Sequence, residues 1–185
     1  MAPSDREKMI AGQPYLASDP ELVNARLRAR RLWARFNGAE PGDEVGRRAL
    51  LTELLGGIGA RSFVEAPFHC DYGWNIVIGE GVFVNFGAVF LDPAPIHIGD
   101  EAQLGPAVQL LTADHPREAD VRAAGPESAR PIRIGARAWL GGGVIVCPGV
   151  TIGEGTVVGA GSVVIRDLPA GVVAAGNPCR VKRHL

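Results

Sequence analysis

The sequence predicts a mainly β protein: a parallel β-helix of hexapeptide repeats, with a small N-terminal helical segment and one long excursion loop. An aliphatic residue recurs every six positions through residues 134–168. Glycine follows four of these six residues, and small residues such as Ala138 and Ser162 mostly occupy the fourth position after them. A period of six fits neither an α-helix nor an alternating strand, but is typical of short strands wound into a prism. The six aliphatic residues are Ile134, Leu140, Val146, Ile152, Val158 and Val164.

Each hexapeptide is expected to form one face of the prism. Its aliphatic side chain points to the axis, and its glycine lies at a corner that excludes a Cβ. Three hexapeptides close one coil, and stacked coils bury continuous ladders of aliphatic side chains. An ordinary α/β sheet would need helices between its parallel strands, and residues 134–168 leave no room for them. We therefore predict a β-helix over residues 61–185 that ends in a short C-terminal tail.

The repeat also occurs earlier in the chain, with two interruptions. The spacing of six runs from Ile78 to Phe90 and again from Ile98 to Leu110, in a phase shifted by two residues. The shift predicts a longer corner at residues 92–95. The repeat then disappears until residue 132. Because long loops that leave a rigid scaffold usually carry function, we expect an active-site loop at residues 111–131, the segment that contains His115.

Residues 1–60 are predicted to form a helical segment. A short helix is expected from Asp5 to Ile10, closed by a glycine. A second helix should begin at Ser18, which stands three residues before Glu21 as in a capping box, and end near Gly38. Its arginines, Arg26 among them, are interpreted as a solvated face. A third helix should follow, with its apolar residues facing inward: Val45, Ala49, Leu50, Leu54 and Leu55.

Composition disfavours several classes of partner. The net charge is -1 and the pI is ≈ 6.4, so neither nucleic acid nor an anionic membrane is favoured. No apolar run approaches the roughly 18 residues of a membrane span. The N-terminus is charged where a signal peptide would be apolar, so we expect a cytoplasmic protein. The three cysteines lack the paired spacing of a metal site, and no metal is expected.

Five stretches of the sequence carry a resemblance to a known family. They are EKMIAGQPYLASDPELVNARLRARRLW, CDYGWNIVIGEGVFVNF, TADHP in the loop, IGARAWLGGGVIVCPGVTIG and the closing AAGNPCRVKR. In this order they resemble the maltose and galactoside O-acetyltransferases, collinearly from about Glu7 to Arg183. The resemblance implies a left-handed β-helix and an enzyme that moves an acetyl group from acetyl-CoA to a sugar hydroxyl. It also implies a homotrimer with the active site between neighbouring prisms.

By this resemblance, His115 in TADHP is the general base. A neutral hydroxyl is a poor nucleophile, and an imidazole can take up its proton and return it to the departing thiolate, typically a gain of about 10²–10⁴-fold. Asn85 matches the family's active-site asparagine, which assists acceptor placement and the tetrahedral intermediate. Without the family, His115 would be an ordinary surface residue, and Asn85 a corner residue that tolerates a left-handed backbone.

Acceptor and coenzyme contacts are expected at two further sets of residues. Carboxylates accept hydrogen bonds from paired hydroxyls, and the acceptor candidates are Asp71, Asp19 and Asp92, each with a cap or turn as its alternative role. The resemblance implies coenzyme contacts at apolar, glycine-corner and basic positions. These are Trp139, Gly142, Ala160, Ile165, Arg166, Arg180 and Arg183. The family more often carries threonine and lysine at positions 165 and 166, and a plain basic tail is the alternative for the C-terminus.

Three alternatives stay open. In the first, the acceptor is a non-sugar or xenobiotic compound instead of maltose, glucose or a galactoside. In the second, the chain is a non-catalytic scaffold. In the third, it is a hexapeptide carbonic anhydrase. The last would need zinc held by three histidines. His69, His97 and His115 are available, but the sequence lacks the close histidine pair that such enzymes use. Coenzyme binding separates the enzyme from the scaffold, and metal analysis tests the carbonic anhydrase.

Overall fold

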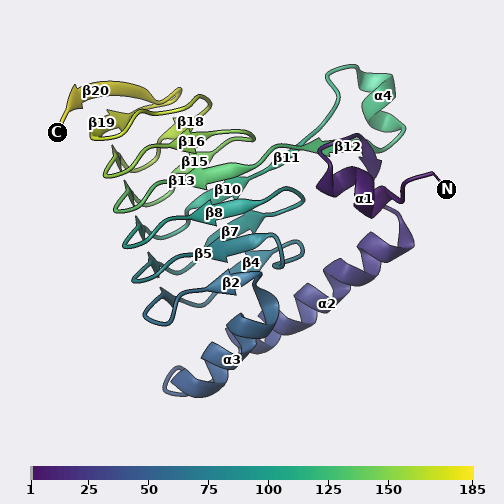
Figure 1. Cartoon of the computed structure of the whole chain (residues 1–185), viewed down its shortest axis with the longest axis horizontal. Helices are drawn as coiled ribbons and strands as arrows, with labels where there is room; N and C mark the ends of the chain where they lie inside the picture. Colours follow the sequence, from purple (N-terminus) through teal and green to yellow (C-terminus); the bar gives the residue numbers. More distant parts are fainter. Residues whose placement is uncertain (1) are drawn as a thin grey trace.

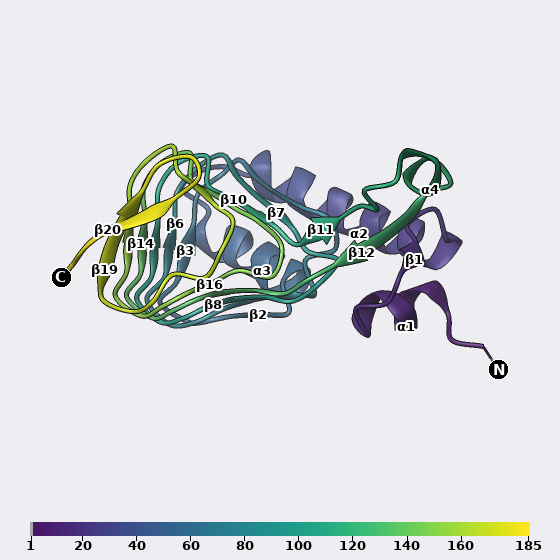
Figure 2. The same cartoon turned by 90° about the horizontal axis from the view of Figure 1, so that it is seen from above.

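A prism of stacked coils forms the body of the protein (Figure 1). The computed structural model describes residues 2–185. The strands of the prism lie in three sheets, one for each side, and the chain passes from sheet I to sheet II to sheet III in every coil. Viewed from above, the coils nest one over another (Figure 2). The predicted β-helix is confirmed.

Each sheet collects one strand from successive coils. Sheet I contains β2 (Gly57–Ile58), β5 (Ile76–Ile78), β8 (Ile96–Ile98), β13 (Ile132–Ile134) and β16 (Thr151–Ile152). Sheet II contains β3 (Phe63–Val64), β6 (Phe83–Val84), β9 (Gln103–Leu104), β14 (Trp139–Leu140), β17 (Val157–Val158), β19 (Val172–Ala175) and β20 (Arg180–His184). Sheet III contains β4 (Phe68–Cys70), β7 (Ala88–Leu91), β10 (Gln109–Leu111), β15 (Ile145–Val146) and β18 (Val163–Val164). Neighbouring strands are parallel except that β20 returns antiparallel along β19, so the expected C-terminal tail is a strand.

The repeated aliphatic side chains fill the axis of the prism. Leu140 and Val146 are fully buried, and so is Ala138 at the fourth position of its repeat. At the corner after Leu140, a Cβ on Gly141 would lie 2.6 Å from the backbone nitrogen of Ala160 in the next coil. This approach excludes every side chain larger than hydrogen. The inward rows predicted from the six-residue period are therefore confirmed.

The coils differ in length at one corner. In the first coils, register partners such as Ile58 and Ile78 are 20 residues apart, whereas Ile134 and Ile152 are 18 apart. The extra residues fall where sheet III passes to sheet I, which we call the III–I corner. The longer corner predicted at residues 92–95 is one of these. One coil later, the predicted loop leaves the prism from the same corner (Figure 1).

Three helices precede the prism. They are α1 (Asp5–Ile10), α2 (Pro20–Asn37) and α3 (Glu44–Leu54). The first is confirmed at its predicted bounds, and α2 ends next to Gly38 as expected. Apolar residues of α2 pack into the same core as the first coils, among them Leu32 and Phe36. Over residues 2–185, no helix combines the length and the apolar character needed to cross a membrane.

The start of α2 differs from the prediction by one residue. Its N-cap is Asp19, and not Ser18. The Asp19 side chain accepts the N–H of Glu21 at 2.9 Å. Pro20 then becomes the first helical residue, where its missing N–H costs no hydrogen bond. Pro20 therefore places the N-cap at Asp19.

The buried face of α3 also differs from the prediction. Val45 is 83% exposed and Ala49 is exposed as well. The predicted Leu54 and Leu55 are buried and Leu50 is partly buried against the core, but the helix also buries Arg47 and Leu51. The buried guanidinium of Arg47 lies 5.1 Å from the ring centroid of Phe36, and this aromatic contact stabilises the cation away from water. An arginine at a core position was not apparent from an apolar pattern.

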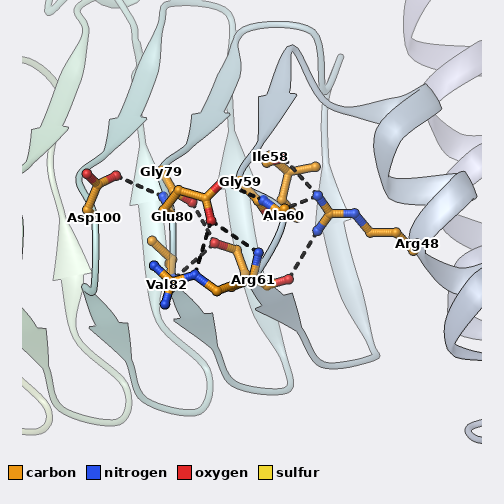
Figure 3. Close-up of polar contacts among 10 residues, drawn as sticks. Arg48, Ile58, Gly59, Ala60, Arg61, Gly79, Glu80, Val82 and Asp100 are labelled. Atoms are coloured by element: carbon orange, nitrogen blue, oxygen red, sulfur yellow. Dashed lines mark hydrogen bonds and ion pairs between the residues drawn. The ribbon is translucent and has the colours of Figure 1, made fainter.

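Side chains satisfy backbone groups at the corner between sheets I and II (Figure 3). Glu80 of the second coil accepts two backbone N–H groups of the first coil, and Asp100 of the third coil accepts the N–H of Glu80 at 2.8 Å. These bonds connect each coil to the next. Arg48 of α3 connects the helix to the first coil of the prism. It donates hydrogen bonds at 2.8, 2.9 and 3.1 Å to the carbonyl oxygens of Ile58, Gly59 and Ser62.

Candidate active site

The loop that leaves the third coil folds into an arm, residues 112–131. The arm contains β11 (Ala113–Asp114), α4 (Ala119–Ala123) and β12 (Pro126–Ala129). On one side β12 pairs antiparallel with β11, and on the other with β1 (Tyr15–Leu16) of the N-terminal segment. The result is a three-stranded sheet in the order β1-β12-β11. Figures 1 and 2 show it projecting from the prism beside α1.

His115 lies at the start of the arm, directly after β11, and is exposed. Its backbone N–H donates to Oδ1 of Asp114 at 2.9 Å. The Asp114 carboxylate also pairs with the guanidinium groups of Arg117 at 3.1 Å and Arg130 at 3.5 Å. The two arginines offset the negative charge next to His115. The turn thereby fixes the backbone of His115 and leaves its imidazole accessible to a substrate.

A cluster of ionisable side chains surrounds the base of the arm. Burial raises the pKa of the Asp71 carboxyl. The charge of Arg26 lowers this pKa, and the charge of Glu127 raises it. Arg26 of α2 donates to the Tyr72 hydroxyl at 2.7 Å. Glu127 of β12 accepts a hydrogen bond from the Tyr15 hydroxyl at 3.0 Å. The cluster therefore joins α2, β1, the arm and the III–I corner of the first coil, and the predicted acceptor residue Asp71 lies in it.

Sequence analysis missed two members of this cluster. Arg26 is not on a purely solvated face, because its guanidinium also lies 5.6 Å from the ring centroid of Tyr72. Glu127 lies within the predicted loop, but no local pattern marks it. It enters the site because β12 pairs with β1, and its hydrogen-bond partner Tyr15 is 112 residues away in sequence.

Asp92, an acceptor contact expected from the sequence, has a structural role in this chain. Its side chain is 0% exposed. The pKa of its carboxyl is raised to about 7, because the effect of burial outweighs that of the hydrogen bonds from backbone N–H groups, which lower the pKa. Its two carboxylate oxygens accept three such groups from the preceding coil, those of Asp71 at 3.0 Å, Tyr72 at 2.8 Å and Gly73 at 2.8 Å. Asp92 thus shapes the corner that presents Asp71.

Asp19, the third acceptor candidate, serves the alternative role that the sequence offered. One of its carboxylate oxygens caps α2. A cap of this kind typically stabilises a protein by about 1 kcal/mol. The cap uses one of the two carboxylate oxygens, so the acceptor contact of Asp19 stays a prediction.

Asn85 lies on a different edge of the prism from His115. It follows β6, where sheet II passes to sheet III, which we call the II–III corner. Its Oδ1 accepts the backbone N–H of Phe86 at 2.8 Å. His115 and Asp71 lie beyond the far end of sheet III, at the III–I corner. Within one chain, the structure does not bring Asn85 and His115 together.

Three predicted coenzyme contacts lie on the side of Asn85. Gly142 and Ala160 occupy the II–III corner in successive coils, and the N–H of Gly161 donates to the Gly142 carbonyl at 2.9 Å. Trp139 is 55% exposed on the outer face of sheet II. The glycine corners bring the backbone close to the surface, and the indole forms an apolar wall next to it.

The other four predicted coenzyme contacts are spread further. Arg180 and Arg183 are exposed on β20, at the end of sheet II. Ile165 is 46% exposed, and it follows β18 together with the exposed Arg166. This pair therefore lies at the III–I corner, across sheet III from Gly142. One straight coenzyme along a single edge would not reach all seven residues of one chain.

The three histidines of the carbonic anhydrase alternative do not converge. His69 lies in β4 of sheet III and His97 in β8 of sheet I, on different sides of the prism, while His115 is on the arm. In the described part of the chain, no three His, Cys, Asp or Glu side chains are placed to share a metal ion. Within one chain, these histidines therefore do not form a zinc site.

Comparisons with known proteins establish the family. The sequence pattern of the maltose acetyltransferase hexapeptide capping motif matches residues 8–59, and that of the bacterial transferase hexapeptide (six repeats) matches residues 131–166. Nodulation protein L of Rhizobium leguminosarum bv. viciae is 50% identical over 183 residues, which cover 98% of this chain and 96% of the relative. A maltose O-acetyltransferase from Clostridium difficile 630 superimposes with a TM-score of 0.98 at 44% identity, covering 100% of this chain and 99% of that chain. The chain belongs to the maltose and galactoside O-acetyltransferase family.

A further family member was solved with its coenzyme. This galactoside acetyltransferase in complex with coenzyme A superimposes with a TM-score of 0.95 at 37% identity, covering 99% of this chain and 92% of that chain. Family and enzyme class agree with the expectation from the sequence, and the chain is an acetyltransferase.

Proposed function

We propose that this acetyltransferase moves an acetyl group from acetyl-CoA to a hydroxyl of a sugar, with His115 as the general base. The position of His115 carries the proposal. Its side chain is exposed near the start of the arm, and β12 of the same arm brings Glu127 close to Asp71. Carboxylates and a guanidinium suit an acceptor with several hydroxyl groups, because they accept and donate the hydrogen bonds that sugar hydroxyls offer. The maltose and galactoside enzymes among the relatives support a sugar of this kind.

The proposed reaction is a direct transfer. His115 takes the proton of the sugar hydroxyl while the hydroxyl oxygen attacks the carbonyl carbon of the thioester. The tetrahedral intermediate then releases the thiolate, which receives the proton from the imidazolium, so the products are an acetyl ester and coenzyme A. Because Oδ1 of Asn85 already accepts a backbone N–H, its amide nitrogen is the group that can donate to the oxyanion.

The coenzyme is proposed to run along the II–III corner. The exposed indole of Trp139 suits the pantetheine arm, and the backbone around Gly142 suits the thioester oxygen. Arg180 and Arg183 on β20 suit the phosphates, because a guanidinium binds phosphate oxygens in pairs. Ile165 and Arg166 lie at the other edge, and we propose that they meet the coenzyme of a neighbouring subunit.

Release of free thiol from acetyl-CoA with a panel of sugars tests the function. The proposal expects release that depends on a sugar such as maltose, glucose or a galactoside. Coenzyme binding with no release for any sugar would contradict the sugar acceptor and favour a non-sugar one. A chain that does not bind acetyl-CoA would instead be a scaffold.

A cytoplasmic location stays a prediction, which cell fractionation would test.

We further propose that the active enzyme is a homotrimer with shared sites. His115 and Asn85 lie on opposite edges of sheet III, so the II–III corner of one copy must face the III–I corner of another. Sheet II also exposes apolar side chains that a partner would cover, since Phe63 and Phe83 are 42% and 38% exposed with rings stacked 6.4 Å apart. Three-fold closure repeats one such contact and leaves no open interface.

Mixing two inactive variants tests the shared site. His115→Ala and Asn85→Ala should each be inactive alone, whereas chains unfolded and refolded together should recover about a quarter of wild-type activity, because about three quarters of random trimers are mixed and each mixed trimer has one intact site of three. Refolding each variant alone is the control. Absence of recovery, or an active monomer on gel filtration, would refute the shared site.

A further inference from the structure

One row of side chains runs from β1 to β12 in the three-stranded sheet beside the prism. Tyr15 of β1 is the register partner of Glu127 of β12, and Ser128 is the partner of Asp114 of β11. Side chains directly opposite in an antiparallel pair lie on the same face, with Cβ atoms about 4.5–5.5 Å apart. Tyr15 and Glu127 therefore lie side by side on one face of the sheet, in a row from β1 to β12.

Tyr15 is a rigid donor at one end of this row. It is 2% exposed and packs in a small apolar cluster with Met9, Leu22 and Tyr72. Its hydroxyl donates to Oε2 of Glu127 at 3.0 Å. Burial, followed by the nearby Glu127 carboxylate, raises the pKa of Tyr15, so the hydroxyl keeps its proton at neutral pH. The bond holds one oxygen of Glu127 and leaves the other available to a ligand.

Glu127 needs such a partner because a second carboxylate is close. The charge of Glu127 contributes to the raised pKa of Asp71, so the two carboxylates repel each other. Without a donor, repulsion would turn the flexible Glu127 side chain away from Asp71 into solvent. The backbone pairing of β1 with β12 comprises two register pairs, and a ladder so short is weak by itself. The side-chain bond therefore also stabilises the contact between the N-terminal segment and the arm.

We propose that Tyr15 is a positioning residue of the acceptor site: it holds the Glu127 carboxylate beside Asp71 and the arm against the N-terminal segment. The proposal rests on the proposed function, because Glu127 and Asp71 face the acceptor in that reaction. It makes the N-terminal segment part of the acceptor site. The acceptor, and not acetyl-CoA, should sense the Tyr15 hydroxyl, since the predicted coenzyme residues lie on the prism and not on the sheet of the arm.

Tyr15→Phe removes the hydroxyl alone and tests the proposal. Loss of a hydrogen bond to a charged group should lower kcat/KM for the sugar about tenfold, with the KM for acetyl-CoA unchanged. In a Glu127→Met background, where no carboxylate remains to be held, the same change should cost less than about twofold. Met9→Leu is the matched control, because it alters the packing around Tyr15 and leaves the hydrogen bond; it should change sugar kinetics less than about twofold.

Three results would overturn the proposal: sugar kinetics of Tyr15→Phe equal to wild type, an equal loss with and without Glu127, or a matching rise in the KM for acetyl-CoA. A wild type that acetylates no sugar would refute the proposed function separately. Amide hydrogen exchange in β12 decides the Tyr15 proposal in every case. Exchange there should be faster in Tyr15→Phe than in wild type and Met9→Leu, and equal exchange in all three would overturn it.

Discussion

Replacing His115 by alanine should lower kcat for acetyl transfer to a sugar by about 10²–10⁴-fold, the range that a general base typically contributes. The side chain is exposed at the start of the arm, so its removal leaves no cavity in the core. The turn that carries it is held by the backbone N–H of His115 and by Asp114, and neither changes in the variant. Coenzyme affinity and the thermal unfolding midpoint should therefore stay at wild-type values while thiol release falls.

His97→Ala is the control for His115→Ala. His97 lies on sheet I between Val77 and Arg133 of the neighbouring strands, on a side of the prism away from the arm. Its loss should leave sugar-dependent thiol release unchanged. Full activity in the His115 variant would assign the base to another group. Equal losses in both variants would indicate a general effect on folding, and not a catalytic base.

The prism could be predicted from the sequence because its rule is local. A period of six places one residue per face on the axis, and burial of Ile134, Leu140 and Val146 follows from that period alone. The shift of two residues at 92–95 also shows where a coil is longer. The α3 helix shows the limit of the same reasoning. An apolar pattern selected Val45, but the buried face includes Arg47, whose guanidinium is stabilised by an aromatic ring that another helix supplies.

The proposed acceptor side of the site depends on long-range pairing, and local sequence patterns predict its residues only in part. His115 and Asp71 were found through motifs, whereas Glu127 and Arg26 are brought in by β1 and α2. The role of Asp92 was also hidden. Its position in a longer corner suits an exposed turn, and only the three-dimensional stacking of coils places three N–H groups around it.

Asp92→Asn should lower the free energy of unfolding by about 1–3 kcal/mol. The carboxylate accepts three backbone N–H groups, and an asparagine of the same shape turns an NH₂ group towards one of them. A buried donor left without an acceptor costs about 1–3 kcal/mol. Urea unfolding at a fixed protein concentration measures the change, because subunit association would otherwise shift the midpoint.

Asp100→Asn is the control for Asp92→Asn. It measures the loss of stability when an acidic residue at an exposed corner is replaced. Asp100 is also a corner aspartate that accepts a backbone N–H, that of Glu80 at 2.8 Å, but it is exposed. Water can replace its bond, so the loss should be much smaller. The Asp92 variant should also raise the KM for the sugar, because the corner that it shapes presents Asp71. An Asp92→Asn protein as stable as Asp100→Asn would show that the carboxylate does not hold the corner, and Asp92 would again be a candidate for contact with the acceptor.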